Sequence, residues 1–192
     1  MALATRTCHM SNPLRILKTL DQHLTLPAEI TLFGRSALAL GYAQAPANFH
    51  NTQDVDGILP LDWLRPPDQH EDFWQAVQST NRELEPDGLY LTHLFREVDV
   101  ILQPDWLDRR QRLDVDLQKL AVFRPATIDL ILTKMARADD DDLQDIECLL
   151  RQESLTRDQL EMAFARARVP DVPEIQELFK HARPKVLALA RS

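Results

Sequence analysis

The segment from residue 29 to residue 59 constrains the fold more than any other part of the chain. Residues 29–33 read as a short strand, Gly34 permits a sharp turn, and residues 36–43 have the composition of a helix. After a polar loop, residues 54–59 predict a second strand that opens with Asp-Val-Asp. This order predicts a mixed α/β (α+β) fold in which helices surround a sheet.

The two carboxylates of that second strand must point the same way. Side chains alternate across a strand, so Asp54 and Asp56 share one face and Val55 points to the other. Two like charges so close together repel unless a cation neutralises them. Mg²⁺ is a hard divalent cation that commonly binds one or two carboxylates together with the phosphates of a nucleotide. The pair therefore predicts a metal site.

Three motifs occur together in the chain: a glycine-x-serine turn that opens a helix, an Asp-x-Asp strand, and a downstream lysine followed by two carboxylates. They are formed by Gly34, Ser36, Asp54, Asp56, Lys134, Asp142 and Asp145. In this combination the chain resembles the nucleotidyltransferase superfamily. Within that superfamily it is most similar to the single-domain bacterial group related to abortive-infection and toxin–antitoxin nucleotidyltransferases. The resemblance runs from about residue 29 to about residue 150.

The resemblance implies a nucleotidyltransferase-like mixed sheet with flanking helices. It divides the chain into an N-terminal helix (1–24), a core (25–124) and a helical C-terminal region (125–192). The implied activity is magnesium-dependent transfer of a nucleotidyl group from a nucleoside triphosphate to a hydroxyl acceptor. It also implies a toxin-like effector in bacteria, with an antitoxin-like protein partner. The alternative is a catalytically degenerate module that keeps the fold for binding or interaction.

The expected catalytic residues are Asp54 and Asp56, which hold the Mg²⁺, and a third carboxylate on a neighbouring strand. Asp99, between two valines, is the candidate for that third group, although a surface strand also produces such an aspartate. Gly34 and Ser36 are expected to bind the nucleotide's phosphates at the start of the helix. A serine at that position can instead act only as a helix cap.

The downstream motif is expected to add Lys134, Asp142 and Asp145 to the nucleotide-binding residues, with Lys134 at the rim of the cleft. The resembled group carries a basic turn between the lysine and the carboxylates. Here that turn is the acidic run at residues 139–142, which removes phosphate contacts. The other interpretation of this run is structural, because Asp139 can cap a helix whose dipole favours acids in its first turn.

Apolar spacing and breakers predict the remaining elements. Helices are expected at 13–24, from a cap at Asp68 to a stop near residues 86–88, and at 126–137, 140–151, 156–167 and 172–190, the last interrupted at Pro184. Further strands are expected at 89–94, 97–102 and 113–123. A second Asp-x-Asp, Asp114 and Asp116, has no glycine turn before it and is interpreted as a solvated face.

Charge and composition limit the partners. The formal net charge is −8, which disfavours binding to a phosphate backbone, so a tRNA acceptor gains no support from the charge. Cys8 and Cys148 lie far apart and form no metal-ligand or redox motif, which fits a reducing cytoplasm. No apolar run approaches the roughly 18 residues of a membrane span, so no membrane partner is expected.

Overall fold

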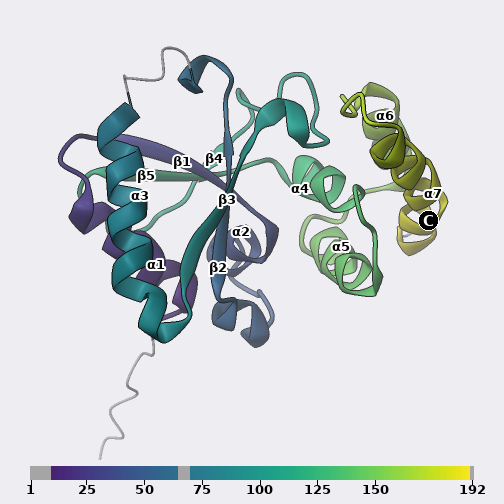
Figure 1. The fold of residues 1–192 in the computed structure, drawn as a ribbon. Coiled ribbons are helices and arrows are strands. Elements are labelled where there is room, and N and C mark those ends of the chain that lie inside the picture. The colour runs from purple at the N-terminus through teal and green to yellow at the C-terminus, as the bar shows by residue number, and fades with distance from the viewer. Residues whose placement is uncertain (1–9, 65–69, 191–192) are drawn as a thin grey trace, which may run out of the picture.

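A five-stranded mixed sheet forms the centre of the computed structural model, which describes residues 10–64 and 70–190 (Figure 1). The strand order is β3-β2-β1-β5-β4. The strands are β1 (Ala28–Phe33), β2 (Asp54–Leu59), β3 (Tyr90–Arg96), β4 (Gln111–Arg112) and β5 (Leu120–Arg124). The central strand β1 runs antiparallel to β2 and parallel to β5, while β3 is parallel to β2 and β4 antiparallel to β5.

Helices flank this sheet. They are α1 (Asn12–His23), α2 (Gly34–Gly41), α3 (Glu71–Leu84), α4 (Thr127–Lys134), α5 (Asp140–Glu153), α6 (Arg157–Arg166) and α7 (Pro173–Leu189). In Figure 1, α1 and α3 pack together at the left of the view, and α4 to α7 gather at the right, with α6 and α7 farthest from the sheet. The architecture confirms the mixed α/β fold.

The first helix shows why this sequence folds locally as it does. Pro13 stands at the first helical positions, where its missing N–H costs nothing, and Ile16, Leu17 and Leu20 recur at helical spacing and are fully buried. Asp21 of the same helix accepts hydrogen bonds from three successive backbone N–H groups before and at the start of β5. Helix α1 is thereby tied to the sheet by apolar packing and by a carboxylate.

The hydrophobic core is continuous from α1 to α7. One cluster of buried side chains includes residues of the first and the last helix, such as Leu17 of α1 and Val186 of α7. It also includes Ile30 and Val122 of the central strands. A smaller cluster surrounds Trp106. The C-terminal helices therefore pack on the same core as the sheet.

Three expectations about secondary structure were wrong. Residues 97–102 form no strand: a 3-10 turn, Glu97–Asp99, follows β3 directly. Residues 113–123 are not one strand: residues 113–119 form the loop between β4 and β5, and only residues 120–123 are extended, as part of β5. Helix α7 continues through Pro184 instead of breaking there. Because α7 lies at the edge of the molecule, it tolerates a lost hydrogen bond there more easily than a central helix would.

Among the described residues, no helix is long and apolar enough to cross a membrane. Cys8 and Asp68 lie outside these residues, and Cys148 is a free, half-buried thiol on α5. For the site, the important feature is the pairing of the central strands. Phe33 at the end of β1 lies opposite Asp56 of β2, so the glycine turn after β1 starts beside the carboxylates.

Candidate active site

The turn between β1 and α2 brings its backbone against a carboxylate. Gly34 has a φ of 65°, in the left-handed region that disfavours other residues. A β-carbon at this position would lie 3.4 Å from Oδ2 of Asp56. Ser36 is buried, and its hydroxyl donates to the carbonyl of Phe33 at 2.9 Å. Ser36 is thus the third residue of α2 and braces the turn by donating to its backbone; it does not cap the helix, because the N-cap is Phe33 and no side chain caps it.

Asp54 and Asp56 lie on one face of β2, as the alternation of the strand requires. Oδ1 of Asp54 accepts a hydrogen bond from the Thr52 hydroxyl at 2.7 Å. Oδ1 of Asp56 lies 3.2 Å from the Thr92 hydroxyl and 3.1 Å from Nδ1 of His93. Burial, followed by the charge of Asp54, raises the pKa of Asp56 above its ordinary value. The charge of Asp54 thus opposes the ionisation of Asp56, and a bound cation would relieve this effect.

A bulge in β3 places two side chains beside Asp56. Val55 pairs with Leu91, but Gly57 pairs with Leu94, so two residues of β3, Thr92 and His93, stand opposite one residue of β2. Such bulges re-aim side chains, and here both neighbours reach the same carboxylate oxygen. The groups that reach Asp56 from the neighbouring strand are therefore a hydroxyl and an imidazole, whereas the expected third group was the carboxylate of Asp99.

A cavity of about 490 Å³ and one of about 570 Å³ flank the α2 turn. The larger opens beside Asp54 and is also lined by Thr92 and His93. Among residues 10–64 and 70–190 there is no cluster of three or more His, Cys, Asp or Glu side chains that could hold a metal. Two carboxylates next to an open cavity nevertheless fit Mg²⁺, which takes few protein ligands and completes its shell with water and phosphate.

Asp99 lies at the other end of the strands from this site. Strands β2 and β3 run parallel, with Asp54 paired to Tyr90 and Leu59 to Arg96. At about 3.3 Å per residue, the five steps from Asp54 to Leu59 span about 16 Å, and Asp99 follows beyond Arg96. Its carboxylate accepts two 2.7 Å hydrogen bonds from the Arg96 guanidinium, which lower its pKa. The expected convergence of Asp99 with the Asp-x-Asp pair was wrong, because the strand that would have carried it does not form.

Lys134, Asp142 and Asp145 do come together, but as a buried ion-pair network. Nζ of Lys134 lies 2.6 Å from Asp145 and 3.2 Å from Asp142, and all three side chains are less than 10% exposed. Arg137 donates to Asp142 at 2.8 Å. Lys134 is therefore not at the rim of a cleft, where it was expected. Its buried ion pairs link α4 to α5.

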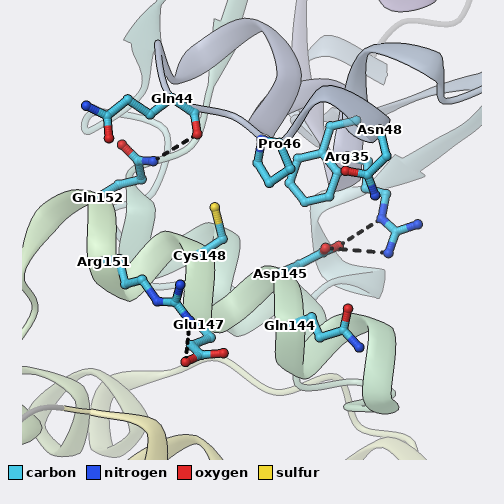
Figure 2. A pocket seen from close by; sticks show the side chains of 11 residues that line it. Arg35, Gln44, Pro46, Asn48, Gln144, Asp145, Glu147, Cys148, Arg151 and Gln152 are labelled. Carbon is cyan, nitrogen blue, oxygen red and sulfur yellow. Dashed lines mark hydrogen bonds and ion pairs between the residues drawn. The ribbon is translucent and has the colours of Figure 1, made fainter.

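Arg35, in the middle of the glycine turn, connects the turn to this network. Its guanidinium lies 3.2 Å from Asp145 and 3.5 Å from Asp141, and it is stacked over the Phe49 ring at 5.4 Å. Figure 2 shows the Arg35 side chain directed toward Asp145 of α5, with which it is paired. Asp141 is exposed, and because its carboxylate lies 3.5 Å from Arg35, the acidic turn contacts a residue of the site. Asp139 also caps α5, accepting from the backbone N–H of Asp142 at 2.9 Å, as the structural interpretation expected.

The sequence analysis missed several residues that the fold brings to the site. Arg35 could have been noticed, because it stands between the glycine and the serine of the phosphate-binding turn. Thr92 and His93 carried no such signal, since only the bulge in β3 directs both toward Asp56. Arg137 precedes the acidic run and offsets part of its charge through Asp139 and Asp142.

Comparison with known proteins adds one finding. Residues 14–178 match a protein family described as nucleotidyltransferase of unknown function (DUF6036). The match includes every residue discussed above as part of the site. Comparisons with curated proteins and with solved structures found no match.

Proposed function

Because the chain belongs to this family of nucleotidyltransferases, we propose that it transfers a nucleotidyl group from a nucleoside triphosphate to a hydroxyl acceptor with Mg²⁺. The single observation that carries the proposal is the placement of Asp54 and Asp56. They share one face of β2, they lie beside the Gly34 turn, and Asp54 lines an open cavity. No other pair of carboxylates in the described residues combines these three features.

Asp54 and Asp56 are the residues that would hold the cation. When bound there, Mg²⁺ would supply charge stabilisation for the phosphates and the leaving pyrophosphate. The protein contributes two carboxylates fixed by neighbours: Thr52 orients Asp54, while Thr92 and His93 orient Asp56. The raised pKa of Asp56 supports this role, because a cation favours the ionised form that burial and Asp54 disfavour.

The start of α2 and Arg35 are suited to the negative charge of a triphosphate. The first N–H groups of a helix lack intrahelical partners, and the helix dipole favours an anion there. Gly34 leaves room for a phosphate to approach the backbone because it has no side chain. Arg35 adds a guanidinium whose bidentate geometry matches phosphate oxygens.

The test is to replace one carboxylate and measure transfer. The Asp54→Asn variant should lose at least about a hundredfold in rate, because an amide has no charge to hold the cation. Asp114→Asn is the matched control, since Asp114 is an exposed aspartate of the other Asp-x-Asp. Transfer is measured as label moved from an α-labelled nucleoside triphosphate to any component of a cell extract. Wild-type rates in the Asp54→Asn protein would contradict the proposal.

A specific observation also favours the second candidate, a binding module without catalysis. Lys134 is neutralised by Asp142 and Asp145, Arg35 is paired with Asp145, and no third carboxylate stands beside Asp56. Such a module would bind the nucleotide and transfer nothing. A thermal shift with Mg²⁺ and nucleotide, combined with no transfer by the wild-type protein, identifies it, because a ligand of the native state raises the apparent stability.

We further propose a toxin-like role with an antitoxin-like protein partner. If this proposal holds, expression of the wild-type chain arrests bacterial growth and Asp54→Asn relieves the arrest at equal protein level. Growth arrest by both proteins would separate the toxicity from nucleotidyl transfer. The label-transfer experiment identifies the acceptor, with tRNA, protein and small molecules resolved as separate fractions.

A further inference from the structure

The cavity of about 490 Å³ lies between α5 and the loop that follows α2 (Figure 2). Asp145, Cys148 and Gln152 recur at helical spacing, so they face the cavity from one side of α5. Pro46 and Phe49 line the opposite side. Its volume falls within the range of small-molecule pockets, about 300–1,000 Å³.

The chemistry of this cavity changes from one end to the other. At one end, Arg35 supplies a positive charge; its guanidinium contacts Asp145 at 3.2 Å. In the middle, Cys148 lines the α5 side, and Figure 2 shows its sulfur directed toward the loop that carries Pro46 and Phe49. At the other end, the side-chain amide of Gln152 donates to the Gln44 carbonyl at 3.4 Å. A ligand for this cavity therefore has an anionic end, a flat or apolar middle and hydrogen-bonding groups at its far end.

Arg35 joins this cavity to the one beside Asp54. Arg35 and Asn48 line both, so the two cavities adjoin at the turn that follows β1. From Asp145 to Gln152 the helix rises about 10 Å, which is enough for a base and a ribose. A nucleotide with its phosphates at Gly34 and Arg35 would extend naturally along α5.

We infer that the cavity beside α5 binds the nucleoside part of the nucleoside triphosphate, with the base between Phe49 and Cys148 and its edge at the Gln152 amide. This inference rests on the proposed function and adds to it the place where the base is read. A glutamine amide offers N–H donors and a carbonyl acceptor, which complement the acceptor and donor on the edge of a base.

The experiment uses the Cys148 thiol of the native protein as the reporter. Iodoacetamide labels the protein with Mg²⁺ alone, with Mg²⁺ and a nucleoside triphosphate, or with Mg²⁺ and inorganic tripolyphosphate, and peptide mapping follows Cys148 separately from Cys8. At about ten times its Kd, the nucleoside triphosphate leaves about a tenth of the sites free, so the labelling of Cys148 should slow about tenfold. Tripolyphosphate, measured at the same multiple of its own Kd, should leave the labelling rate within about twofold, because it has no nucleoside part.

A pair of variants gives an independent readout. Cys148→Trp fills the cavity and should weaken nucleoside triphosphate binding about tenfold or more while leaving tripolyphosphate binding unchanged. Ala165→Trp is the control, because it adds the same side chain at an exposed position that lines a different cavity. The thermal unfolding of both variants shows whether they fold.

The outcomes separate the two proposals. Bound nucleoside triphosphate that leaves Cys148 labelling unchanged overturns the inference and leaves the proposed function intact. Equal slowing by nucleoside triphosphate and tripolyphosphate also overturns it, since the effect then does not depend on the nucleoside. If the wild-type protein binds neither ligand in Mg²⁺, the proposed function fails, and the inference with it.

Discussion

At the scale of single residues, Asp56 is the carboxylate of the site whose pKa its surroundings raise. It is held between Asp54 on its own strand, the Gly34 turn of the next strand and the imidazole of His93. At Asp21, burial raises the pKa, but three backbone N–H groups outweigh the effect and lower it. At Asp56, the contacts with His93 and Thr92 do not outweigh burial and the charge of Asp54, so its pKa stays raised.

We predict that Asp56→Asn stabilises the metal-free protein. Because the folded-state pKa of Asp56 is raised, its ionised form disfavours folding at pH 7, and this cost decreases as the pH falls. A neutral amide removes the cost, and the midpoint of thermal unfolding in EDTA should rise by about 2 °C, which corresponds to about 1 kcal/mol for a chain of this size. The measurement is a thermal melt at pH 7 without divalent cations.

The control for this prediction is Asp116→Asn, an exposed loop position that should leave the midpoint unchanged. With Mg²⁺ and nucleotide present, the wild-type protein should have the higher unfolding midpoint instead of Asp56→Asn, because only the wild-type site gains stability from the ligand. A destabilised Asp56→Asn protein in EDTA would show that Asp56 is a structural residue.

At the scale of elements, the start of α5 is the part of the site that departs most from the resembled group. Asp139 caps the helix and lies within 2.7 Å of Arg137, so one acid of the run is structural. Asp141 is different, because its exposed carboxylate lies 3.5 Å from Arg35. The acidic turn thus begins a helix and, in the proposed function, would compete with a nucleotide for Arg35.

We predict that Asp141→Lys tightens the binding of a nucleoside triphosphate. The change removes a competitor for Arg35 and replaces a repulsive charge with an attractive one. At low salt the gain should be about fivefold in Kd, and it should shrink above 0.1 M ionic strength, where exposed charges are screened over about 10 Å. Calorimetric titration of the nucleotide at two salt concentrations measures both effects.

Asp158→Lys is the matched control, since Asp158 is an exposed acid in the first turn of α6. Both substitutions remove an acid from a helix start and lose the same favourable interaction with the helix dipole. Equal nucleotide affinity of the Asp141→Lys and wild-type proteins at both salt concentrations would mean that the run is only a helix start.

At the scale of the whole molecule, the loop between β3 and β4 holds the C-terminal helices to the sheet. Asp129 of α4 is fully buried and accepts hydrogen bonds from the Gln103 backbone N–H at 2.7 Å and from Arg109 at 2.8 Å. Gln103 in turn donates to the Ala163 carbonyl of α6 at 2.6 Å. Leu102 pairs with Arg168 across an isolated bridge. The loop between β3 and β4 therefore contacts α4, α6 and the segment between α6 and α7.

We predict that Asp129 makes folding pH-dependent. Burial raises its pKa from 3.8 to about 6, so the folded protein binds this proton more tightly than the unfolded chain. The free energy of unfolding should therefore contain a contribution that falls as the pH rises from about 4 to about 6, by at most about 3 kcal/mol at 1.36 kcal/mol per pKa unit. Urea unfolding between pH 4 and pH 7 measures it.

Asp129→Asn isolates this contribution, because the variant cannot titrate at that position while every other group remains. The difference in unfolding free energy between the variant and the wild-type protein should change with pH in this window and become constant above about pH 7. A difference that stays constant throughout would show that Asp129 remains ionised, held by Arg109.

The sequence by itself determined the parts of this protein that depend on local pattern. The limits of β2, the glycine turn, most helices and the shared face of Asp54 and Asp56 follow from alternation, helical spacing and breakers, which act over a few residues. The cap at Asp139 follows in the same way. These features need no knowledge of the distant chain.

Only the tertiary structure decided which distant residues meet. The bulge in β3 turns Thr92 and His93 toward Asp56, and the 3-10 turn that replaces the expected strand leaves Asp99 at the far end. Arg35 meets Asp145, which is 110 residues away in the chain. Strand register, bulges and buried ion pairs depend on the packing of elements that are far apart in sequence, and no local periodicity encodes that packing.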